Sequence, residues 1–226
     1  MNLTLFDLDH TLLAGDSDHM WGQFLVDMGV VERSVYERAN NRFYTQYKAG
    51  NLDVHAYQRF ALQPLVDNPR ARMHSLRERF VTERVRPAVA RHAPALISAR
   101  RQAGDQIAII TATNSFITAP IAALLGIDQL IATEPELVDN QYTGAIAGTP
   151  SFQAGKITRL RDWQASQTQP IAYTRFYSDS HNDLPLLRHV DHAVAVDPDP
   201  QLAAAAAAAG WPVISLRGDV APDLSV

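Results

Sequence analysis

The 226-residue sequence predicts an α/β fold: a parallel sheet with helices on its faces and an all-helical block inserted after the first strand. Three observations predict it. The chain opens on an unbroken apolar run that ends in two carboxylates and a threonine (Asn2 to Thr11), as is typical of a parallel strand buried on both faces. Residues 17–85 then carry only helical periodicity. From residue 106, strand and helix patterns alternate as they do in βαβ units.

Four helices are expected in the inserted block. Ser17 and Asp18 offer an N-cap for the first, Asp53 caps the third, and Pro69 opens the fourth. The expected ranges are Met20 to Met28, Val31 to Ala49, Val54 to Val66 and Pro69 to Val85. Because no strand pattern interrupts the block, we interpret residues 14–85 as a helical cap over the strand ends. Residues 1–13 and 86–226 then form the core domain.

The core resumes with a helix that Pro87 starts, and its remaining elements follow from the apolar patterns. The expected helices are Ala88 to Gln102, Phe116 to Leu125, Ala154 to Ala165, Asp183 to Val190 and Gln201 to Ala209. The expected strands are Gln106 to Thr111, Leu130 to Ala132, Arg175 to Ser178, Ala193 to Val196 and Pro212 to Leu216. Residues Glu136 to Ala147, with a turn at Asp139-Asn140, indicate a hairpin or flap.

Composition limits the classes of partner. Hydrophobic residues make up 46% and charged residues 19% of the chain, and the net charge of −4 favours neither nucleic acid nor a membrane surface. The absence of cysteine excludes disulfides, thiolate catalysis and cysteine metal sites. Acids at positions 7 and 9 interrupt the apolar run that a signal peptide needs. We therefore expect a cytoplasmic protein, monomeric or homodimeric, that acts on a small molecule.

Groups that can carry chemistry collect where the expected strands end. Asp7 and Asp9 are two residues apart, so in an extended chain they leave the same face and repel each other. Thr111 and Asp179 end two further strands, and Lys156, one of only two lysines, begins a helix. Ligands of open α/β sheets bind at the carboxyl ends of the strands, so these groups should converge. Carboxylates suit Mg²⁺, and a lysine with free amides at a helix start suits phosphate.

Such a set indicates phosphoryl transfer. Asp7 can attack phosphorus to give an aspartyl-phosphate, while Asp9 can protonate the leaving alkoxide and then deprotonate water. Plainer roles compete with these. Thr111 and Asp183 could cap helices, and Lys156 could be a surface lysine, although a cation at a helix N-terminus opposes the helix dipole.

Four motifs in order resemble those of the haloacid-dehalogenase-like phosphohydrolases. Asp7-Leu8-Asp9-His10-Thr11 resembles the family's Asp-x-Asp-x-Thr motif, Thr111 the second motif, Lys156 the third, and Ser178 to Asp183 the fourth. The helical insertion resembles the type I-cap branch, and Asn182-Asp183 with the flap near Tyr142 resembles its phosphoserine-phosphatase-like members (family IB). The resemblance implies a Rossmann-like parallel sheet core and a magnesium-dependent phosphatase.

The resemblance also implies a role for each motif residue. The implied nucleophile is Asp7 and the implied general acid and base is Asp9. The implied metal set is Asp7, Asp9 through its backbone carbonyl, Asp179 and, beside them, Asp183. The implied phosphate set is Thr111, Lys156, Asn182 and the amides of Ala112, Thr113 and Asn114.

Substrate choice is expected to come from the cap. Asp16 stands nine residues after Asp7, where phosphoserine phosphatases carry a glutamate that meets the substrate's amino group, and Asp18 is close by. Two acids favour an amine-bearing phosphate ester, although N-capping competes for either one. Arg59 is the nearest candidate to bind a substrate carboxylate, but its motif is poor. Phosphoserine and an amino-alcohol phosphate such as histidinol phosphate both remain open.

The leading hypothesis is a magnesium-dependent phosphomonoester hydrolase that acts on a small, amine-bearing metabolite. One alternative is a phosphotransferase that passes the phosphoryl group to an alcohol. The other is a regulatory phosphate-binding protein in which turnover is incidental. Intact acids at positions 7, 9 and 179 favour the enzyme.

Overall fold

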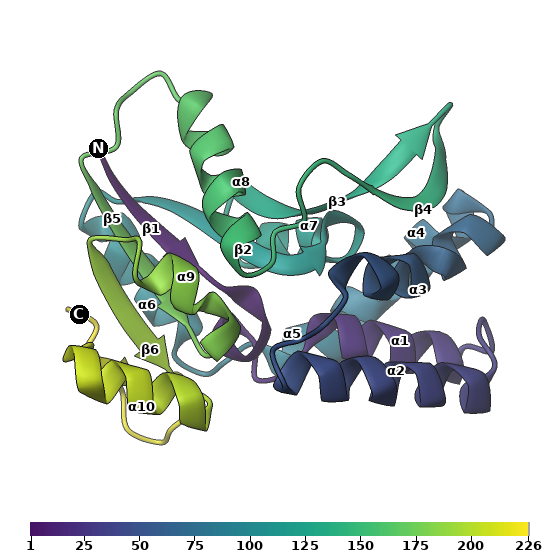
Figure 1. The fold of residues 1–226 in the computed structure, drawn as a ribbon, viewed down its shortest axis with the longest axis horizontal. Coiled ribbons are helices and arrows are strands. Elements are labelled where there is room, and N and C mark those ends of the chain that lie inside the picture. The colour runs from purple at the N-terminus through teal and green to yellow at the C-terminus, as the bar shows by residue number, and fades with distance from the viewer. Residues whose placement is uncertain (226) are drawn as a thin grey trace.

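In the computed structural model, which describes residues 1–225, one seven-stranded sheet runs through the molecule (Figure 1). Its order is β4-β3-β2-β1-β5-β6-β7. Neighbouring strands are parallel except for β3 and β4, which form an antiparallel hairpin. The strands are β1 (Asn2–Phe6), β2 (Gln106–Asn114), β3 (Gln129–Val138), β4 (Gln141–Ala147), β5 (Tyr173–Ser178), β6 (His192–Val196) and β7 (Val213–Ile214). The predicted parallel α/β sheet is confirmed, with β1 at its centre.

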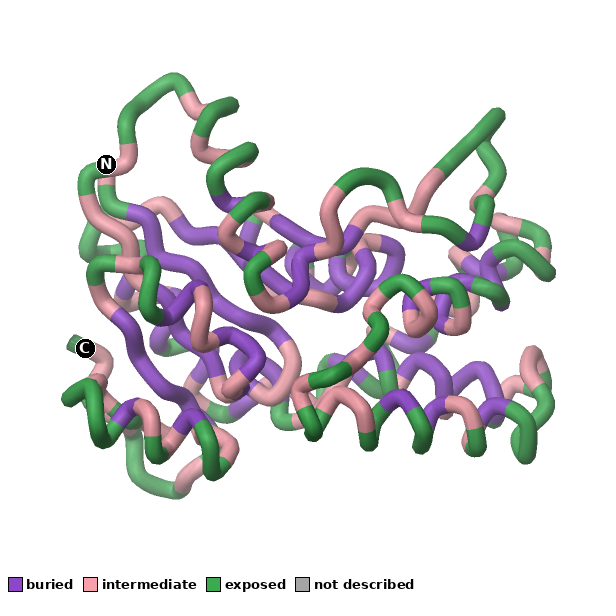
Figure 2. The backbone as a smooth tube through the Cα atoms, viewed as in Figure 1, coloured by how far each residue is buried: buried purple, intermediate pink, exposed green. Residues whose placement is uncertain are grey.

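Helices cover both faces of the sheet. One face packs against α8 (Ala154–Ala165), α9 (Leu184–Leu187) and α10 (Pro200–Ala209), and the other against α6 (Ala93–Gln102) and α7 (Ser115–Leu124). In β1, Leu3 and Leu5 join the first cluster and Phe6 joins the second. Both faces of β1 are therefore buried, and its one buried polar side chain, Thr4, donates to Asp105 Oδ2 at 2.8 Å. Strands β1, β2 and β6 are buried along most of their length, whereas β4 is mostly exposed or half-buried (Figure 2).

Four long helices follow β1 and lie beyond the carboxyl ends of the central strands (Figure 1). They are α1 (Ser17–Asp27), α2 (Arg33–Lys48), α3 (Val54–Asp67) and α4 (Arg70–Phe80). Edge-on and tilted aromatic pairs join them, including Trp21 against Phe80 and Phe43 against Phe60. The all-helical character of the insertion agrees with the sequence pattern. The division into a cap of 14–85 and a core of 1–13 and 86–226 remains a prediction.

The helix expected from Ala88 begins later. A wide turn at Val81–Val85 leads into the short α5 (Arg86–Ala88), and α6 starts only at Ala93. Between them the Ala90 amide donates to the Leu12 carbonyl, and Val89 pairs with Leu13. These contacts hold residues 89–90 extended beside the segment that leaves β1. The helix predicted to begin after Pro87 is therefore interrupted, because long-range pairing with the segment after β1 holds residues 89–90 extended.

Several other boundaries also differ from expectation. Asp16, not Ser17 or Asp18, is the N-cap of α1. Strands β2 and β3 run further than predicted, because β3 continues into the hairpin with β4. The helix expected over Asp183 to Val190 is a turn at His181–Asp183 followed by the short α9, and β7 has only two residues. Within residues 1–225 no helix combines the length and apolar character that crossing a membrane requires.

Candidate active site

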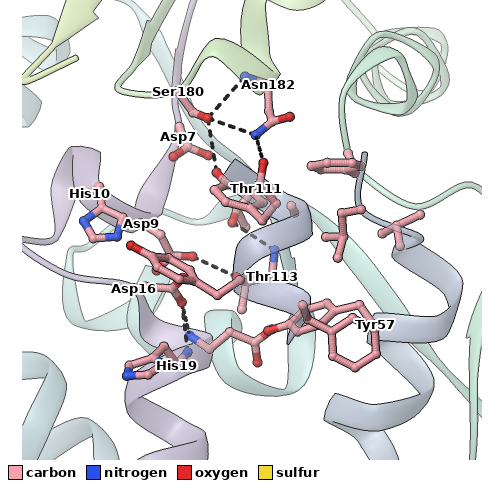
Figure 3. Close-up of a pocket in the computed structure, with 18 of the residues that line it drawn as sticks. Asp7, Asp9, His10, Asp16, His19, Tyr57, Thr111, Thr113, Ser180 and Asn182 are labelled. Carbon is pink, nitrogen blue, oxygen red and sulfur yellow. Dashed lines mark hydrogen bonds between the residues drawn. The ribbon is translucent and has the colours of Figure 1, made fainter. Parts of the chain in front are cut away.

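The ends of the central strands bring together the groups expected to converge. Asp7 follows β1 directly, Thr111 lies in β2, Asp179 follows β5, and Lys156 stands in the first turn of α8. Because β1 pairs in parallel with both β2 and β5, these groups meet at one edge of the sheet. Asp7, Thr111 and Lys156 line one side of a pocket that residues of α1, α2 and α3 line from the other side, and Figure 3 shows Asp7 and Thr111 there. Asp179 lies beside them, within reach of the Thr11 hydroxyl, but outside the lining.

Lys156 is the centre of the charge arrangement. Its Nζ lies 2.8 Å from Asp7 Oδ1 and 2.7 Å from Asp183 Oδ2, and all three side chains are buried. Burial lowers the pKa of Lys156, but the charges of Asp183 and Asp7 more than offset this and hold it above its usual range. Lys156 is thus a fixed, buried cation and not a surface lysine.

Asp7 and Asp179 face a common donor. Thr11 Oγ1 lies 3.5 Å from Asp7 Oδ2 and 3.2 Å from Asp179 Oδ1. Burial raises the pKa of Asp7 to about 6 against the opposing charge of Lys156. Burial and the charge of Asp7 also raise the pKa of Asp179 well above its usual value. The two carboxylates repel each other in a poorly solvated place, and Thr11 alone does not neutralise them.

Asp9 has a different set of partners. Its Oδ1 accepts from the Ser17 amide at 2.6 Å, and its Oδ2 accepts from Thr113 Oγ1 at 2.8 Å. Burial, with the charge of Asp16, raises the pKa of Asp9 well above its usual value despite the hydrogen bond from Ser17. A raised pKa keeps the proton that a general acid must donate. The two motif aspartates are therefore held by different neighbours in different electrostatic settings.

Part of the segment after Thr111 lines the pocket. Ala112 and Thr113 line the pocket, and the Thr113 amide donates to Thr111 Oγ1 at 3.2 Å. Asn114 does not line it: its side chain accepts from the Ile117 amide at 3.4 Å and caps α7. The side chain of Asn114 is therefore engaged by the start of α7, and the expected phosphate contact of the Asn114 amide stays a prediction.

The turn after β5 positions two of the expected residues. Asp183 Oδ2 accepts from Ser178 Oγ at 2.7 Å as well as from Lys156, so this oxygen supports the lysine. Asn182 lines the pocket, and Gln153 Nε2 donates to its Oδ1 at 3.0 Å. Sequence reasoning missed Gln153. Its φ of 49°, rare for a residue with a side chain, is visible only in the structure.

The far end of the pocket is acidic. Asp16, Asp18, Tyr57 and Gln58 line it, and Figure 3 shows Asp16 and Tyr57 away from Asp7 and Asn182. Arg59 does not take part: it is exposed on α3 and lies outside the lining. Successive residues of a helix point about 100° apart, so the face that turns Tyr57 and Gln58 inward turns Arg59 to solvent. The expected carboxylate-binding role of Arg59 is not supported.

The donor set fits a hard divalent cation in part. In residues 1–225, no three Asp, Glu or His side chains converge closely enough to hold a metal by themselves. Asp7 and Asp179, however, are two repelling carboxylates that share only a hydroxyl donor. Mg²⁺ usually keeps several waters and takes one or two carboxylates together with phosphate oxygens. The pair therefore fits a magnesium ion, with oxygens of water and substrate completing the coordination shell.

Comparison with known proteins agrees with this geometry. The family model of haloacid dehalogenase-like hydrolases matches residues 4–188. A protein of Neisseria meningitidis serogroup C named histidinol-phosphatase is 41% identical, over 96% of this chain and 99% of that protein. A phosphoserine phosphatase of Mycobacterium tuberculosis is 31% identical, over 94% of this chain and 70% of the relative.

Solved structures share the fold. A Bordetella pertussis Tohama I protein, described as of unknown function, superposes with a TM-score of 0.89 at 41% identity, covering 95% of this chain and 98% of that one. A phosphoserine phosphatase with a phospho-aspartyl intermediate analogue superposes with a TM-score of 0.69 at 18% identity, covering 96% and 94%. The second match supports the fold alone. The chain belongs to the haloacid dehalogenase-like hydrolases. Within that family it is a phosphatase.

Proposed function

We propose that this phosphatase hydrolyses an amine-bearing amino-alcohol phosphate, with histidinol phosphate as the first candidate, through an aspartyl-phosphate on Asp7 and with Mg²⁺ as cofactor. The observation that carries the substrate proposal is the charge of the pocket. Among the described residues that line it, Lys156 is the only lysine or arginine, while the buried carboxylate of Asp18 lies beside Tyr57 at the far end.

The chemistry follows from the contacts of the two motif aspartates. A carboxylate oxygen of Asp7 attacks phosphorus, the bond to the ester oxygen breaks, and an aspartyl-phosphate forms. Asp9, held by Ser17 and Thr113, gives its proton to the leaving alkoxide. Asp9 then takes a proton from a water that attacks the same phosphorus. Inorganic phosphate leaves and the Asp7 carboxylate is restored.

Lys156 and the metal balance charge in this scheme. Lys156 contacts Asp7 before reaction and is placed to neutralise phosphoryl oxygens as the nucleophile loses its charge. Asp7, Asp179 and the backbone carbonyl of Asp9 would hold Mg²⁺. When bound, this ion supplies charge neutralisation for the phosphoryl oxygens and offsets the repulsion between the carboxylates.

An amino alcohol fits the pocket better than an amino acid. The carboxylate of phosphoserine needs a cation, but Lys156 is engaged by Asp7 and Asp183 at the phosphate end. An ammonium group, by contrast, meets a buried carboxylate, that of Asp18, at the other end. The Neisseria relative named histidinol-phosphatase supports the same choice over the more distant phosphoserine phosphatase.

A substrate panel tests the proposal. Phosphate release from histidinol phosphate, phosphoserine and phosphoethanolamine is measured with Mg²⁺ and after chelation. We expect kcat/KM for histidinol phosphate to exceed that for phosphoserine at least tenfold, and chelation to remove activity that Mg²⁺ restores. A preference for phosphoserine would refute the substrate proposal. If a phosphorylated alcohol accumulated faster than free phosphate, the reaction would be phosphoryl transfer to an alcohol and not hydrolysis.

The metal has a readout that does not depend on turnover. Because bound Mg²⁺ would relieve the repulsion between Asp7 and Asp179, we expect it to raise the Tm of the full chain by several degrees. Asp179→Asn should lose most of this shift, and the exposed Asp162→Asn should keep it. An equal shift in both variants would place the ion elsewhere.

A further inference from the structure

Asp16 and Asp18 lie at the far end of the pocket, and their contacts differ. Asp16 Oδ1 accepts from the amides of Asp18 and His19, both at 2.9 Å, and so caps α1. Its carboxylate is partly exposed and already satisfies two helix-end donors. An acid in this position is explained by the helix it begins.

Asp18 has no such explanation. It is 5% exposed, and Tyr57 donates from its hydroxyl to Asp18 Oδ2 at 2.7 Å. Within residues 1–225 this is its only side-chain hydrogen bond, and no lysine, arginine or histidine lies within ion-pair distance. A buried carboxylate with one neutral donor is costly. Since Asp18 also lines the pocket, the ammonium group of a bound molecule can supply the positive charge that the chain does not provide.

Gln58 provides a second, independent acceptor. Its side chain is 2% exposed and lines the same pocket. Its Nε2 donates to the Ala112 carbonyl at 3.4 Å, whereas its Oε1 is buried without a partner among the described residues. The opposite amide orientation would set two oxygens against each other at Ala112. The unpartnered atom is therefore the acceptor, which again calls for a donor group.

We infer that Asp18, positioned by Tyr57, is the residue that selects a leaving group bearing an ammonium group, with Gln58 as a second acceptor, and that Asp16 serves the fold. This inference rests on the proposed function and deepens it. An ammonium group carries one positive charge and three N–H donors. It supplies the counter-charge that Asp18 lacks and a donor for Gln58.

The arrangement also orients the substrate. Lys156 lies at the phosphate end and Asp18 at the other, so a substrate with a phosphate and an ammonium group meets opposite charges at its two ends. Gln58 lies between the two ends. Its side-chain amide donates to the carbonyl of Ala112, which is next to Thr111. In α3 it directly follows Tyr57, whose hydroxyl binds Asp18. An ester without the amine would bind at the phosphate end only.

The test compares Asp18→Asn with Asp16→Asn. Asparagine is a good N-cap, so Asp16→Asn removes the charge and keeps the start of α1. The readout is the ratio of kcat/KM for histidinol phosphate to that for its deaminated counterpart, which isolates the amine. We expect Asp18→Asn to lower this ratio at least thirtyfold, mainly through KM, and Asp16→Asn to change it less than threefold.

Tyr57→Phe provides a variant that keeps both acids. Burial and the charge of Asp16 raise the pKa of Asp18, and the Tyr57 hydrogen bond lowers it by stabilising the charged form. Burial and the Asp18 charge in turn raise the pKa of Tyr36. The pH at which KM for the amine-bearing ester changes should therefore move upward in Tyr57→Phe, and KM for the deaminated ester should show no such shift.

The outcomes separate the two proposals. If the wild-type protein does not prefer the amine-bearing ester over its deaminated counterpart, the proposed substrate class fails. If the preference exists but is lost in Asp16→Asn and kept in Asp18→Asn, the inference about Asp18 fails and the substrate class stands. An unshifted KM profile in Tyr57→Phe also contradicts the positioning role of Tyr57.

Discussion

Charged side chains at the end of β1 are buried in a group of three. Lys156 stands between Asp7 and Asp183, so two negative charges share one positive charge. Buried ion pairs contribute little net stability, because desolvation offsets the attraction between the charges. The proposed reaction explains the arrangement better, because the phosphoryl group would take over the contact with Lys156.

Asp7→Asn tests the nucleophile. An amide cannot form the acyl-phosphate, so we expect kcat to fall at least ~10⁴-fold, which corresponds to about 5 kcal/mol in the activation barrier. Lys156 keeps its contact with Asp183, so the fold should persist. Single-turnover phosphate release measures the effect, with the exposed Asp162→Asn as control. Residual turnover above 1% would exclude Asp7 as the nucleophile.

The buried carboxyl group of Asp18 also makes the free energy of unfolding depend on pH. Burial raises its pKa from 3.8 to about 7. As pH rises from 4, the unfolded chain releases this proton first, so the folded state loses stability until pH passes 7. We expect Asp18→Asn to raise the free energy of unfolding by about 2 kcal/mol at pH 8 and to have little effect at pH 4.

Urea denaturation at the two pH values measures this difference. The amide oxygen that Asp18→Asn introduces can still accept from the Tyr57 hydroxyl, so the comparison isolates the charge. Asp162→Asn, on the exposed side of α8, should show no such pH dependence. An equal change in the free energy of unfolding at pH 4 and pH 8 would show that the shape of the Asp18 side chain, and not its charge, determines the effect of the substitution.

At the scale of single elements, the start of α8 decides where Lys156 lies. The helix begins beside the loop at Pro150, and a Cβ on Gly155 would lie 2.1 Å from the Pro150 carbonyl oxygen. Only glycine allows this approach. Gln153, two residues earlier, has φ 49° and ψ −124°, a conformation that costs residues with side chains about 1–3 kcal/mol. The backbone before Lys156 is therefore tightly specified.

Gly155→Ala should disturb this helix start. The added methyl group must push against backbone, so we expect a loss of about 1–3 kcal/mol in the free energy of unfolding and a drop in kcat as Lys156 shifts. Thermal unfolding and steady-state kinetics measure the two effects. Gly15→Ala is the matched control, because its Cβ would meet only the Met20 side chain at 3.6 Å. Wild-type kcat in Gly155→Ala would contradict the close packing.

At the scale of the whole molecule, the connection between α2 and α3 is fastened to the sheet side of the pocket. Gln153 Nε2 donates to the Gly50 carbonyl at 3.2 Å, and Asn182 Nδ2 donates to the Tyr47 carbonyl at 3.3 Å. The Tyr47 hydroxyl lies 3.1 Å from Ser180 Oγ. These contacts join segments more than 100 residues apart and close the pocket over Lys156.

Gln153→Ala removes two of these hydrogen bonds, those to Gly50 and Asn182. We expect amide hydrogen exchange to quicken in residues 47–53 and KM to rise about threefold to tenfold, because the closed pocket is less populated. The exposed Gln63→Ala is the matched control. Unchanged exchange in residues 47–53 would show that other contacts hold the loop.

Local patterns in the sequence were enough to predict the parallel sheet, the helical insertion and the order of the motif residues. Apolar runs and helical periodicity are local, and the ends of parallel strands must meet at one edge, so Asp7, Thr111, Lys156 and Asp179 could be placed together from pattern alone. The hairpin after residue 136 and the glycine-bounded helices followed from the same local signals.

The neighbours that complete the site, by contrast, became known only from the packing of the folded chain. Arg59 and Gln58 are adjacent in one helix, yet one faces solvent and the other the pocket. Asp16 and Asp18 are alike in sequence, yet one caps α1 and the other is buried against Tyr57. The burial of Asp18 against Tyr57 and the contact of Gln58 with Ala112 depend on segments distant in the chain, which no local pattern encodes. The strand ends determine the reaction, and the packing of α1 and α3 against them determines which group the pocket can accept.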